Sequence, residues 1–282
     1  MPKIKIVTDS TAYIKNEDLK NLNVTVVPLS VTLDNDHFKE NLKSHEDFFI
    51  QLKKSKGFPT TSQPSVGDFH TAYTEILKEY DEIISIHISE MISGTIHSAN
   101  TAASEIESNK IHVFDSATTA TVLEDMVLTA VEMVKLGYSK VEIINKLSYI
   151  KENNKLLFIV DNLKYLQKGG RIGKAGSILG TILNIKPILY IDGQVGLFDK
   201  VRTRKKALLR IISELEAMAD KYGGINNLKV TLIQVYNREG LIKLEELLKE
   251  KWPELEFNTY SCGPVIGSHV GPGGLGLAFR PK

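Results

Sequence analysis

The chain has 282 residues, of which 35 are basic and 34 acidic, so its formal net charge is +1 and its isoelectric point is about 7.8. This balance argues against a general polyanion binder, because no excess charge draws the chain to nucleic acid or to an anionic membrane. The single cysteine, Cys262, cannot form an intramolecular disulfide or a zinc site built from paired cysteines. The apolar run after Met1 is too short for a signal peptide, so we expect a cytoplasmic globular protein.

The first half of the chain alternates strand-like and helix-like segments. Three β-rich runs each end in a small polar loop and are followed by apolar residues at helical spacing: Lys3–Val7, Glu82–Ile88 and Ile111–Phe114. This rhythm predicts βα units around a parallel sheet.

Further elements of the first half are indicated by local signals. The Val and Thr content of Val24–Leu33 favours a single strand that ends at Asp34. Ser44 and Ser65 each precede an aspartate by three residues, which predicts that helices begin there. The segment 57–64 holds two prolines and three hydroxyl residues, and we expect an ordered loop.

The second half of the chain differs from the first in its sequence pattern. Lys155–Val160 predicts a buried strand, and the glycine-rich basic segment 169–176 suggests a domain junction nearby. Beyond it we expect a hairpin about Asp192-Gly193, helices and one more strand, with these ranges: Pro187–Ile191, Gln194–Val201, Thr203–Tyr222, Leu228–Tyr236 and Arg238–Lys251. The sequence therefore predicts an α/β protein with two domains: residues 1–160 with a doubly wound, mostly parallel sheet, and residues 161–282 with a mixed sheet and helices.

The loops at the predicted strand ends are the first functional signal. Ligands of open α/β sheets bind outside the carboxyl ends of the strands, and segments 8–11, 89–95 and 115–121 are rich in Ser, Thr and Asp there. None of these loops holds Lys or Arg, so a polyphosphate would find little charge compensation. A head group satisfied by hydroxyls and amides fits better, although about half of these residues are expected to serve as helix caps only.

Several common functional motifs are either incomplete or lack the structural context that they need. The GxGxxG match at 271–276 leaves six residues after it, too few for a dinucleotide-binding unit, and is expected to be a turn. Segment 169–176 resembles a phosphate loop but lacks its first glycine and its Ser or Thr. No G-x-S-x-G motif is present, and His45-Glu46 lacks the second histidine of a zinc protease.

Three smaller features can each be interpreted as functional or as purely structural. Ser93 precedes Gly94 at a strand-to-helix turn, where it could meet a ligand or cap a helix. His269 lies between glycines, so its backbone can approach another group closely. Arg202 begins a basic stretch that ends at Lys206, and such stretches are usually solvated helix ends.

Taken in order, these segments resemble the DegV family, whose better understood members are fatty acid-binding B subunits of bacterial fatty acid kinase. The resemblance spans nearly the whole chain and rests on these segments: Val7-Thr8-Asp9-Ser10, Pro59 to Ser65, Ile92-Ser93-Gly94-Thr95, Asp115-Ser116, Gly169-Gly170-Arg171-Ile172 and His269-Val270-Gly271-Pro272-Gly273.

The resemblance implies two α/β domains with a long-chain fatty acid buried between them. It places the carboxyl group of the acid on Thr61 and Ser93, with Ser62 and the Gly94 amide nearby. His269, Arg202 and Arg171 are expected near the exposed end, facing the head group or a partner.

By the same resemblance, the chain is a carrier and not an enzyme. It would deliver the acid to a separate ATP-dependent kinase subunit and carry away acyl phosphate for phospholipid synthesis. The resemblance implies no cofactor, no catalytic residue, no metal, no nucleic acid and no stable membrane insertion.

Two other functions remain as alternatives. A lipid or ester hydrolase would use Ser93 as its nucleophile and His269 as its base. A pure interaction module would bind a partner through the basic stretch from Arg202 to Lys206.

Overall fold

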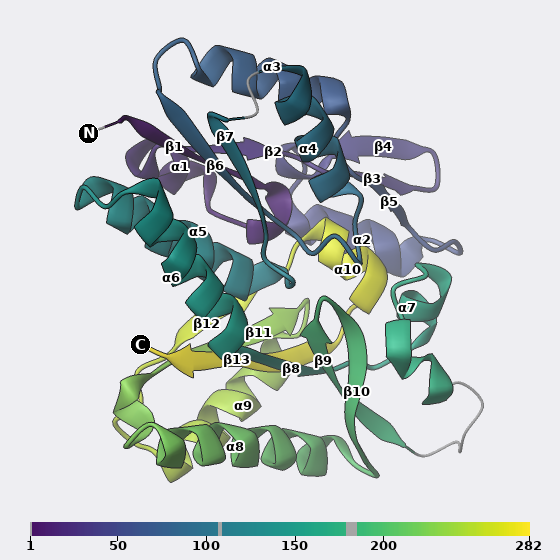
Figure 1. Cartoon of the computed structure of the whole chain (residues 1–282). Coiled ribbons are helices and arrows are strands. Elements are labelled where there is room, and N and C mark those ends of the chain that lie inside the picture. The colour runs from purple at the N-terminus through teal and green to yellow at the C-terminus, as the bar shows by residue number, and fades with distance from the viewer. Residues whose placement is uncertain (1, 107–108, 179–184) are drawn as a thin grey trace. The chain divides into compact units, whose positions relative to one another are not determined.

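The computed structural model of the chain describes residues 2–106, 109–178 and 185–282 (Figure 1). It contains two α/β units, as the sequence predicts, but the division falls elsewhere than the predicted boundary at 160/161. One unit comprises residues 1–44 and 60–152, and the other comprises 45–59 and 153–282. The strand at 155–159 belongs to the second unit because both of its pairing partners lie there. Segment 45–59 joins the second unit because its helix packs on a helix near the C-terminus.

The first unit is built on a four-stranded parallel sheet with the order β2-β1-β6-β7. Its strands are β1 (Ile4–Asp9), β2 (Val24–Val27), β6 (Glu82–His87) and β7 (Ile111–Asp115). Its helices are α1 (Asn16–Leu22), α3 (Val66–Ile76), α4 (Thr95–Glu105), α5 (Ala120–Lys135) and α6 (Lys140–Asn153). Helices α3 and α4 cover one face of the sheet, and α5 and α6 lie on the other (Figure 1), so the predicted doubly wound arrangement is confirmed.

The core of this unit lies between the sheet and the helix pair α3 and α4. Phe69 and Tyr73 of α3 are fully buried against Val7, Ile83 and Ala99. Because all four strands are parallel, their carboxyl ends meet at one edge, and His87 pairs directly with Asp115 there.

A small antiparallel sheet completes the first unit. It has the order β4-β3-β5, with β3 (Ser30–Leu33), β4 (Asp36–Lys39) and β5 (Thr60–Ser62). The prediction of one strand over Val24–Leu33 is wrong, because β2 and β3 belong to different sheets. The break falls at Pro28, which has no amide hydrogen, and at Leu29, whose amide donates to Ser10 Oγ at 3.1 Å.

The second unit carries a six-stranded mixed sheet with the order β10-β9-β8-β13-β11-β12. Its strands are β8 (Lys155–Ile159), β9 (Lys186–Asp192), β10 (Gln194–Val201), β11 (Leu228–Val235), β12 (Asn258–Ser261) and β13 (Gly274–Pro281). Among the residues of this unit that the structure describes, only β11 and β12 pair in parallel. The predicted hairpin about Asp192-Gly193 is confirmed, since β9 and β10 pair across it.

The helices of this unit are α2 (His45–Lys54), α7 (Lys164–Lys168), α8 (Arg204–Lys221), α9 (Arg238–Lys251) and α10 (Pro264–Val270). Helices α8 and α9 bury their apolar stripes, including Ile211, Leu215 and Leu244, on one face of the sheet. The predicted bounds of α9 are confirmed, and α8 begins where Thr203 caps it. Short 3-10 helices lie at Ser10–Ala12, Glu40–Leu42, Gly173–Ile178 and Ile225–Asn227.

The glycine-rich motif at 271–276 is a turn only in part. Pro272 and Gly273 form the turn, but Gly274 already begins β13, which lies between β8 and β11 in the sheet. Glycine weakens the local strand signal, so composition alone does not predict this central strand. Within the described ranges, we find no helix whose length and apolar character would let it span a membrane.

Candidate functional site

A buried hydrogen-bond network closes the carboxyl edge of the parallel sheet. Asp9 ends β1 with its side chain fully buried, and its Oδ1 accepts from the amide of Thr11 at 3.0 Å and from Thr11 Oγ1 at 2.6 Å. Its Oδ2 accepts from the Ile88 amide at 2.9 Å and lies 3.1 Å from His87 Nδ1. The carboxylate therefore ties the loop after β1 to the loop after β6.

The network continues away from Asp9 along β6 to α3. His87 Nε2 lies 2.6 Å from Ser85 Oγ, and Ser85 Oγ accepts from the Tyr73 hydroxyl at 2.8 Å. A carboxylate oxygen accepts, so His87 donates to Asp9 through Nδ1, and its ring links Asp9 to Ser85. Burial raises the pKa of Tyr73, the opposing effect of its bond to Ser85 being smaller, so its hydroxyl stays a donor.

The contacts run from Ser85 through His87 to Asp9, as in a catalytic triad, but the group is closed to solvent. All three side chains are completely buried, and the Tyr73 hydroxyl already occupies the Ser85 oxygen. A nucleophilic serine must reach its substrate, so this chain of bonds fixes the strand ends and does not perform acyl transfer.

Ser93 lies on the rim of this closed edge, in the loop between β6 and α4. The amides of Ile92 and Ser93 both donate to the Ser89 carbonyl, and the Ser89 amide donates to the Thr118 carbonyl at 2.9 Å. Ser93 Oγ lies 2.9 Å from Thr95 Oγ1 and accepts a longer bond, 3.4 Å, from the Thr95 amide. Gly94 is the N-cap of α4 and makes no side-chain cap, so the first turn of the helix offers backbone donors to a ligand.

Thr61 and Ser62 lie on β5, where Thr61 pairs with Val31 and Ser62 with Ser30. Successive side chains of a strand point to opposite faces, and Thr61 is half-buried whereas Ser62 is exposed. The next residue, Gln63, reaches the other predicted segment: a Cβ added to Gly94 would lie only 2.4 Å from Gln63 Nε2. Gly94 thus lets the Gln63 amide lie directly against the start of α4.

The contact between Gln63 and Gly94 places the segment that holds Thr61 and Ser62 next to the segment that holds Ser93 and Gly94. Thr61 and Ser62 lie on β5, and Ser93 and Gly94 lie at the start of α4. Gln63, directly after β5, lies against Gly94. Gln63 is the residue that sequence reasoning missed. Its only signal is a polar amide directly after three hydroxyl residues, in the segment 57–64.

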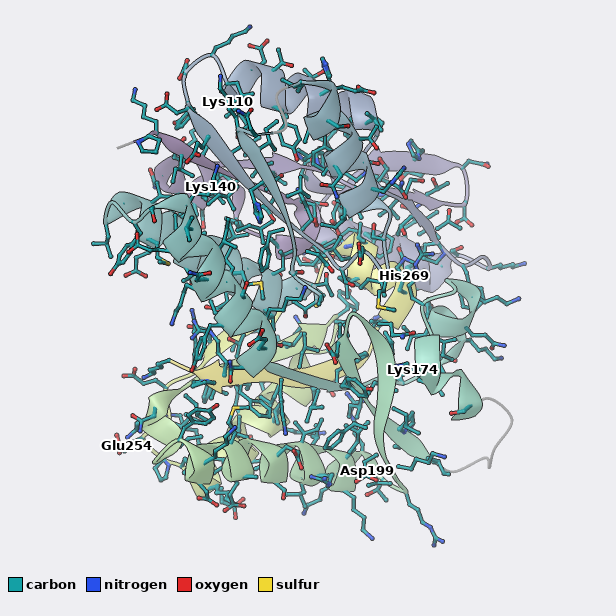
Figure 2. The ribbon with its side chains drawn as sticks, in the orientation of Figure 1. Lys110, Lys140, Lys174, Asp199, Glu254 and His269 are labelled. Carbon is teal, nitrogen blue, oxygen red and sulfur yellow. The ribbon has the colours of Figure 1, made fainter. Side chains whose placement is uncertain are left out.

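The residues predicted to face the head group or a partner belong to the second unit. His269 lies on α10 (Figure 2), next to Gly169 at the end of α7. A Cβ on Gly169 would lie 2.2 Å from His269 Nδ1, so only glycine leaves room for the imidazole there. Arg171 donates to the Gly169 carbonyl at 2.8 Å. Burial, and secondarily the positive charge of Arg171, lower the pKa of His269 to about 4.

The basic stretch after β10 separates into two kinds of residue. Arg204 pairs with Asp161 and donates to the Gly273 carbonyl at 2.7 Å, so it holds the turn before β13. Arg202 is exposed and has no hydrogen-bond or ionic partner among the described residues. The structure therefore groups His269 with Arg171, while Arg202 shares no described bond with them.

The family model described as "Uncharacterised protein, DegV family" matches residues 3–282 of the chain. A DegV domain-containing protein of Halalkalibacterium halodurans is 38% identical over 282 residues, which cover 99% of each chain.

Solved structures match over the same extent. The crystal structure of DegV from Bacillus subtilis, named as a fatty acid binding protein, is 37% identical with a TM-score of 0.90 and full coverage of both chains. A DegV family protein from Thermus thermophilus, whose structure is named for fatty acid binding, is 32% identical with a TM-score of 0.89, covering 99% of this chain and 100% of its own.

Proposed function

Because the chain belongs to the DegV family, we propose that it binds a long-chain fatty acid and carries it to a separate enzyme. Thr61, Ser62, Ser93 and the Gly94 amide would hold the carboxyl group. The observation that carries this proposal is the contact of Gln63 with Gly94 at the start of α4, which places the β5 segment next to the segment of Ser93. The fatty acid binding named for the relatives from Bacillus subtilis and Thermus thermophilus supports it.

The chemistry of this set suits one carboxyl group. Three hydroxyls, one side-chain amide and the backbone donors of a helix N-terminus provide several hydrogen bonds without a cation. A buried carboxylate would be costly without such donors, so the acid is either protonated or saturated with them. The absence of Lys and Arg from 8–11, 89–95 and 115–121 disfavours a polyphosphate at this edge.

The acyl tail would supply most of the affinity. Burying roughly 16 carbons at about 0.8 kcal/mol per methylene gives on the order of 12 kcal/mol before the costs of association. Each neutral hydrogen bond to the carboxyl group adds only about 1 kcal/mol. The hydroxyls would therefore set the orientation of the acid.

The partner in this proposal is an ATP-dependent kinase subunit that converts the carboxyl group into an acyl phosphate, for use in phospholipid synthesis in the cytoplasm. His269, Arg171 and Arg202 would face the head group or this partner. Arg202 suits such a role because its guanidinium is exposed and unpaired among the described residues. The sequence has no complete phosphate-loop motif, so the phosphoryl transfer is assigned to the partner.

Ester hydrolysis by Ser93 gains no support from the geometry. Among the described residues, the Ser93 hydroxyl has Thr95 as its hydrogen-bond partner, where a hydrolase needs a general base. We therefore keep the carrier as the function.

Denaturing extraction of the purified protein, followed by mass spectrometry, tests the proposal. We expect a long-chain acid at about one per chain, and we expect the delipidated protein to bind added acid. Recovery of no acid, together with no binding of acids of 14 to 18 carbons, would overturn it.

A further inference from the structure

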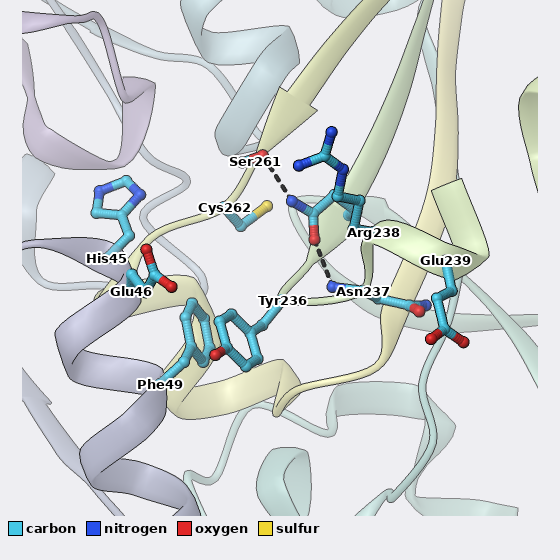
Figure 3. A pocket seen from close by; sticks show the side chains of 10 residues that line it. His45, Glu46, Phe49, Tyr236, Asn237, Arg238, Glu239, Ser261 and Cys262 are labelled. Carbon is cyan, nitrogen blue, oxygen red and sulfur yellow. Dashed lines mark hydrogen bonds between the residues drawn. The ribbon is translucent and has the colours of Figure 1, made fainter. Parts of the chain in front are cut away.

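A second candidate site lies wholly within the second unit, at the carboxyl ends of its parallel strands. A cavity of about 510 Å³ opens where β11 and β12 end, and all of its lining residues come from this unit. Helix α2 forms one side, and the start of α9 forms the other (Figure 3). The order β11, α9, β12 is a βαβ unit, and such units bind ligands at this edge. Its volume falls within the range of about 300 to 1,000 Å³ usual for small-molecule sites.

The walls of this cavity are held by bonds within the protein. Gln234 donates through Nε2 to Ser261 Oγ at 2.6 Å, and its Oε1 accepts from the Asn237 amide at 2.5 Å. Tyr236 has a φ of 48°, a left-handed conformation that is unusual for a bulky residue. Its ring stacks on Phe49 of α2, with ring centres 4.9 Å apart and planes 17° apart. The cavity is therefore bounded by groups that are already fixed.

The charges at the cavity lie on opposite sides. Figure 3 shows Arg238 on one side of Cys262 and Glu46 on the other side. Arg238 is the first residue of α9, a 14-residue helix, so its guanidinium adds to the positive end of the helix dipole. Arg238 and Glu46 are both exposed, and neither has a hydrogen-bond or ionic partner among the described residues.

We propose that this cavity binds a small zwitterion, with the anionic group on Arg238 and the ammonium group on Glu46. A simple anion would gain from Arg238 but would also face the carboxylates of Glu46 and Glu239, which line the same cavity. A simple cation would face the guanidinium instead. Burial lowers the pKa of His45, so this neighbour adds no charge near pH 7. A ligand that carries both charges matches the arrangement.

This site is separate from the proposed fatty acid site. None of its lining residues belongs to the set Thr61, Ser62, Ser93 and Gly94, which lies in the first unit. Loss of zwitterion binding and loss of fatty acid binding are therefore distinguishable in one preparation.

The test is calorimetry, with amide chemical shifts recorded in parallel, on the full chain. Phosphoethanolamine and 4-aminobutyrate serve as probes, and they distinguish a phosphate from a carboxylate as the anionic group. Inorganic phosphate and ethanolamine, each at matched ionic strength, report what one charge alone achieves. We expect at least one zwitterion to bind tenfold or more tightly than either single ion, with shifts at residues 236–239 and 261–262.

Two variants and one control complete the test. Arg238→Gln and Glu46→Gln should each weaken zwitterion binding fivefold or more while leaving fatty acid binding unchanged. Lys243→Gln changes an exposed charge on the same helix outside the cavity and should leave both unchanged. Equal affinity for phosphate and phosphoethanolamine, no saturable binding of either zwitterion, or unchanged binding in both variants would each overturn the proposal.

Discussion

The carboxyl edge of the sheet in the first unit and that of the β11/β12 pair in the second make opposite use of polar residues. In the first, Asp9 accepts from two loops, and the side chains from Tyr73 to Asp9 satisfy one another out of contact with solvent. In the second, Arg238 and Glu46 lie exposed at an open cavity. The two edges differ in their bonding. Polar side chains that bond to one another hold strand ends together, whereas exposed side chains without partners stay available to a ligand.

Removing the centre of the closed edge should have the largest effect. Asp9→Ala leaves the amides of Thr11 and Ile88 and the Nδ1 proton of His87 buried without an acceptor. We expect a loss of about 3 to 5 kcal/mol in the free energy of unfolding, measured by urea denaturation. Asp18→Ala, at an exposed aspartate of the same unit, should change it little. A small effect at Asp9 would mean that the edge is not a framework.

The pH dependence of His269 tests the half-buried imidazole of the second unit. Its pKa of about 4 in the folded protein lies below the ordinary 6.5, so the unfolded chain binds a proton between these values and the folded chain does not. Stability should therefore fall as the pH drops from 6.5 towards 4, by as much as about 3 kcal/mol from this group.

Unfolding curves at pH 7 and pH 4.5 for the wild type and His269→Gln isolate this contribution, because the other titrating groups are common to both. Imidazole chemical shifts of the Arg171→Gln variant should show a higher pKa for His269, since a repelling charge is gone. An unchanged pKa in that variant would remove Arg171 from the neighbourhood of the ring.

A smaller effect is expected on the rim of the closed edge. Ser93→Ala and Thr61→Ala should each weaken binding of palmitate by about 1 to 3 kcal/mol, roughly 5- to 150-fold, because a group of the ligand loses its partner. Ser104→Ala, at an exposed serine on the same helix α4, serves as the control for Ser93. Titration of the delipidated protein measures all three, and unchanged binding in both site variants would exclude these hydroxyls from the site.

The smallest effect concerns the capping box of α3. Ser65 accepts from the Asp68 amide at 3.0 Å, and Asp68 accepts in return from the Ser65 amide at 3.0 Å. Bonds from Lys39 and Ser65 lower the pKa of Asp68 to about 2. Ser65→Ala should cost about 1 kcal/mol of stability, whereas Ser65→Thr keeps the oxygen and should cost less. Equal losses in the two variants, measured by thermal unfolding, would show that the cap oxygen is unimportant.

Local signals in the sequence predicted the local parts of the fold. The cap at Ser65, the bounds of α9 and the hairpin at Asp192-Gly193 depend on residues a few positions apart, and all are present. The break at Pro28 is also a local signal, but the Val and Thr content around it favoured a continuous strand. Composition gave the wrong prediction there, because β2 and β3 on either side of Pro28 belong to different sheets.

The remaining features depend on partners far away in the chain. Strand β13 is recognisable only through β8 and β11, and α2 joins the second unit only through α10. Gln63 meets Gly94 across a helix and a strand, and no spacing rule links them. The cavity at Arg238 needs α2 to meet the end of β11, a contact between residues almost 190 positions apart. Such pairings follow from topology and not from local pattern.

The position of β13 bears on how the protein is made. A ribosome completes this strand after the five others of its sheet, yet it lies between β8 and β11, which in the described part of the chain have no other partner on that side. Until it emerges, β10-β9-β8 and β11-β12 remain separate pieces with unpaired edges, which are the sites where strands of different chains associate. The nascent second unit thus keeps two unpaired strand edges until β13 has been synthesised.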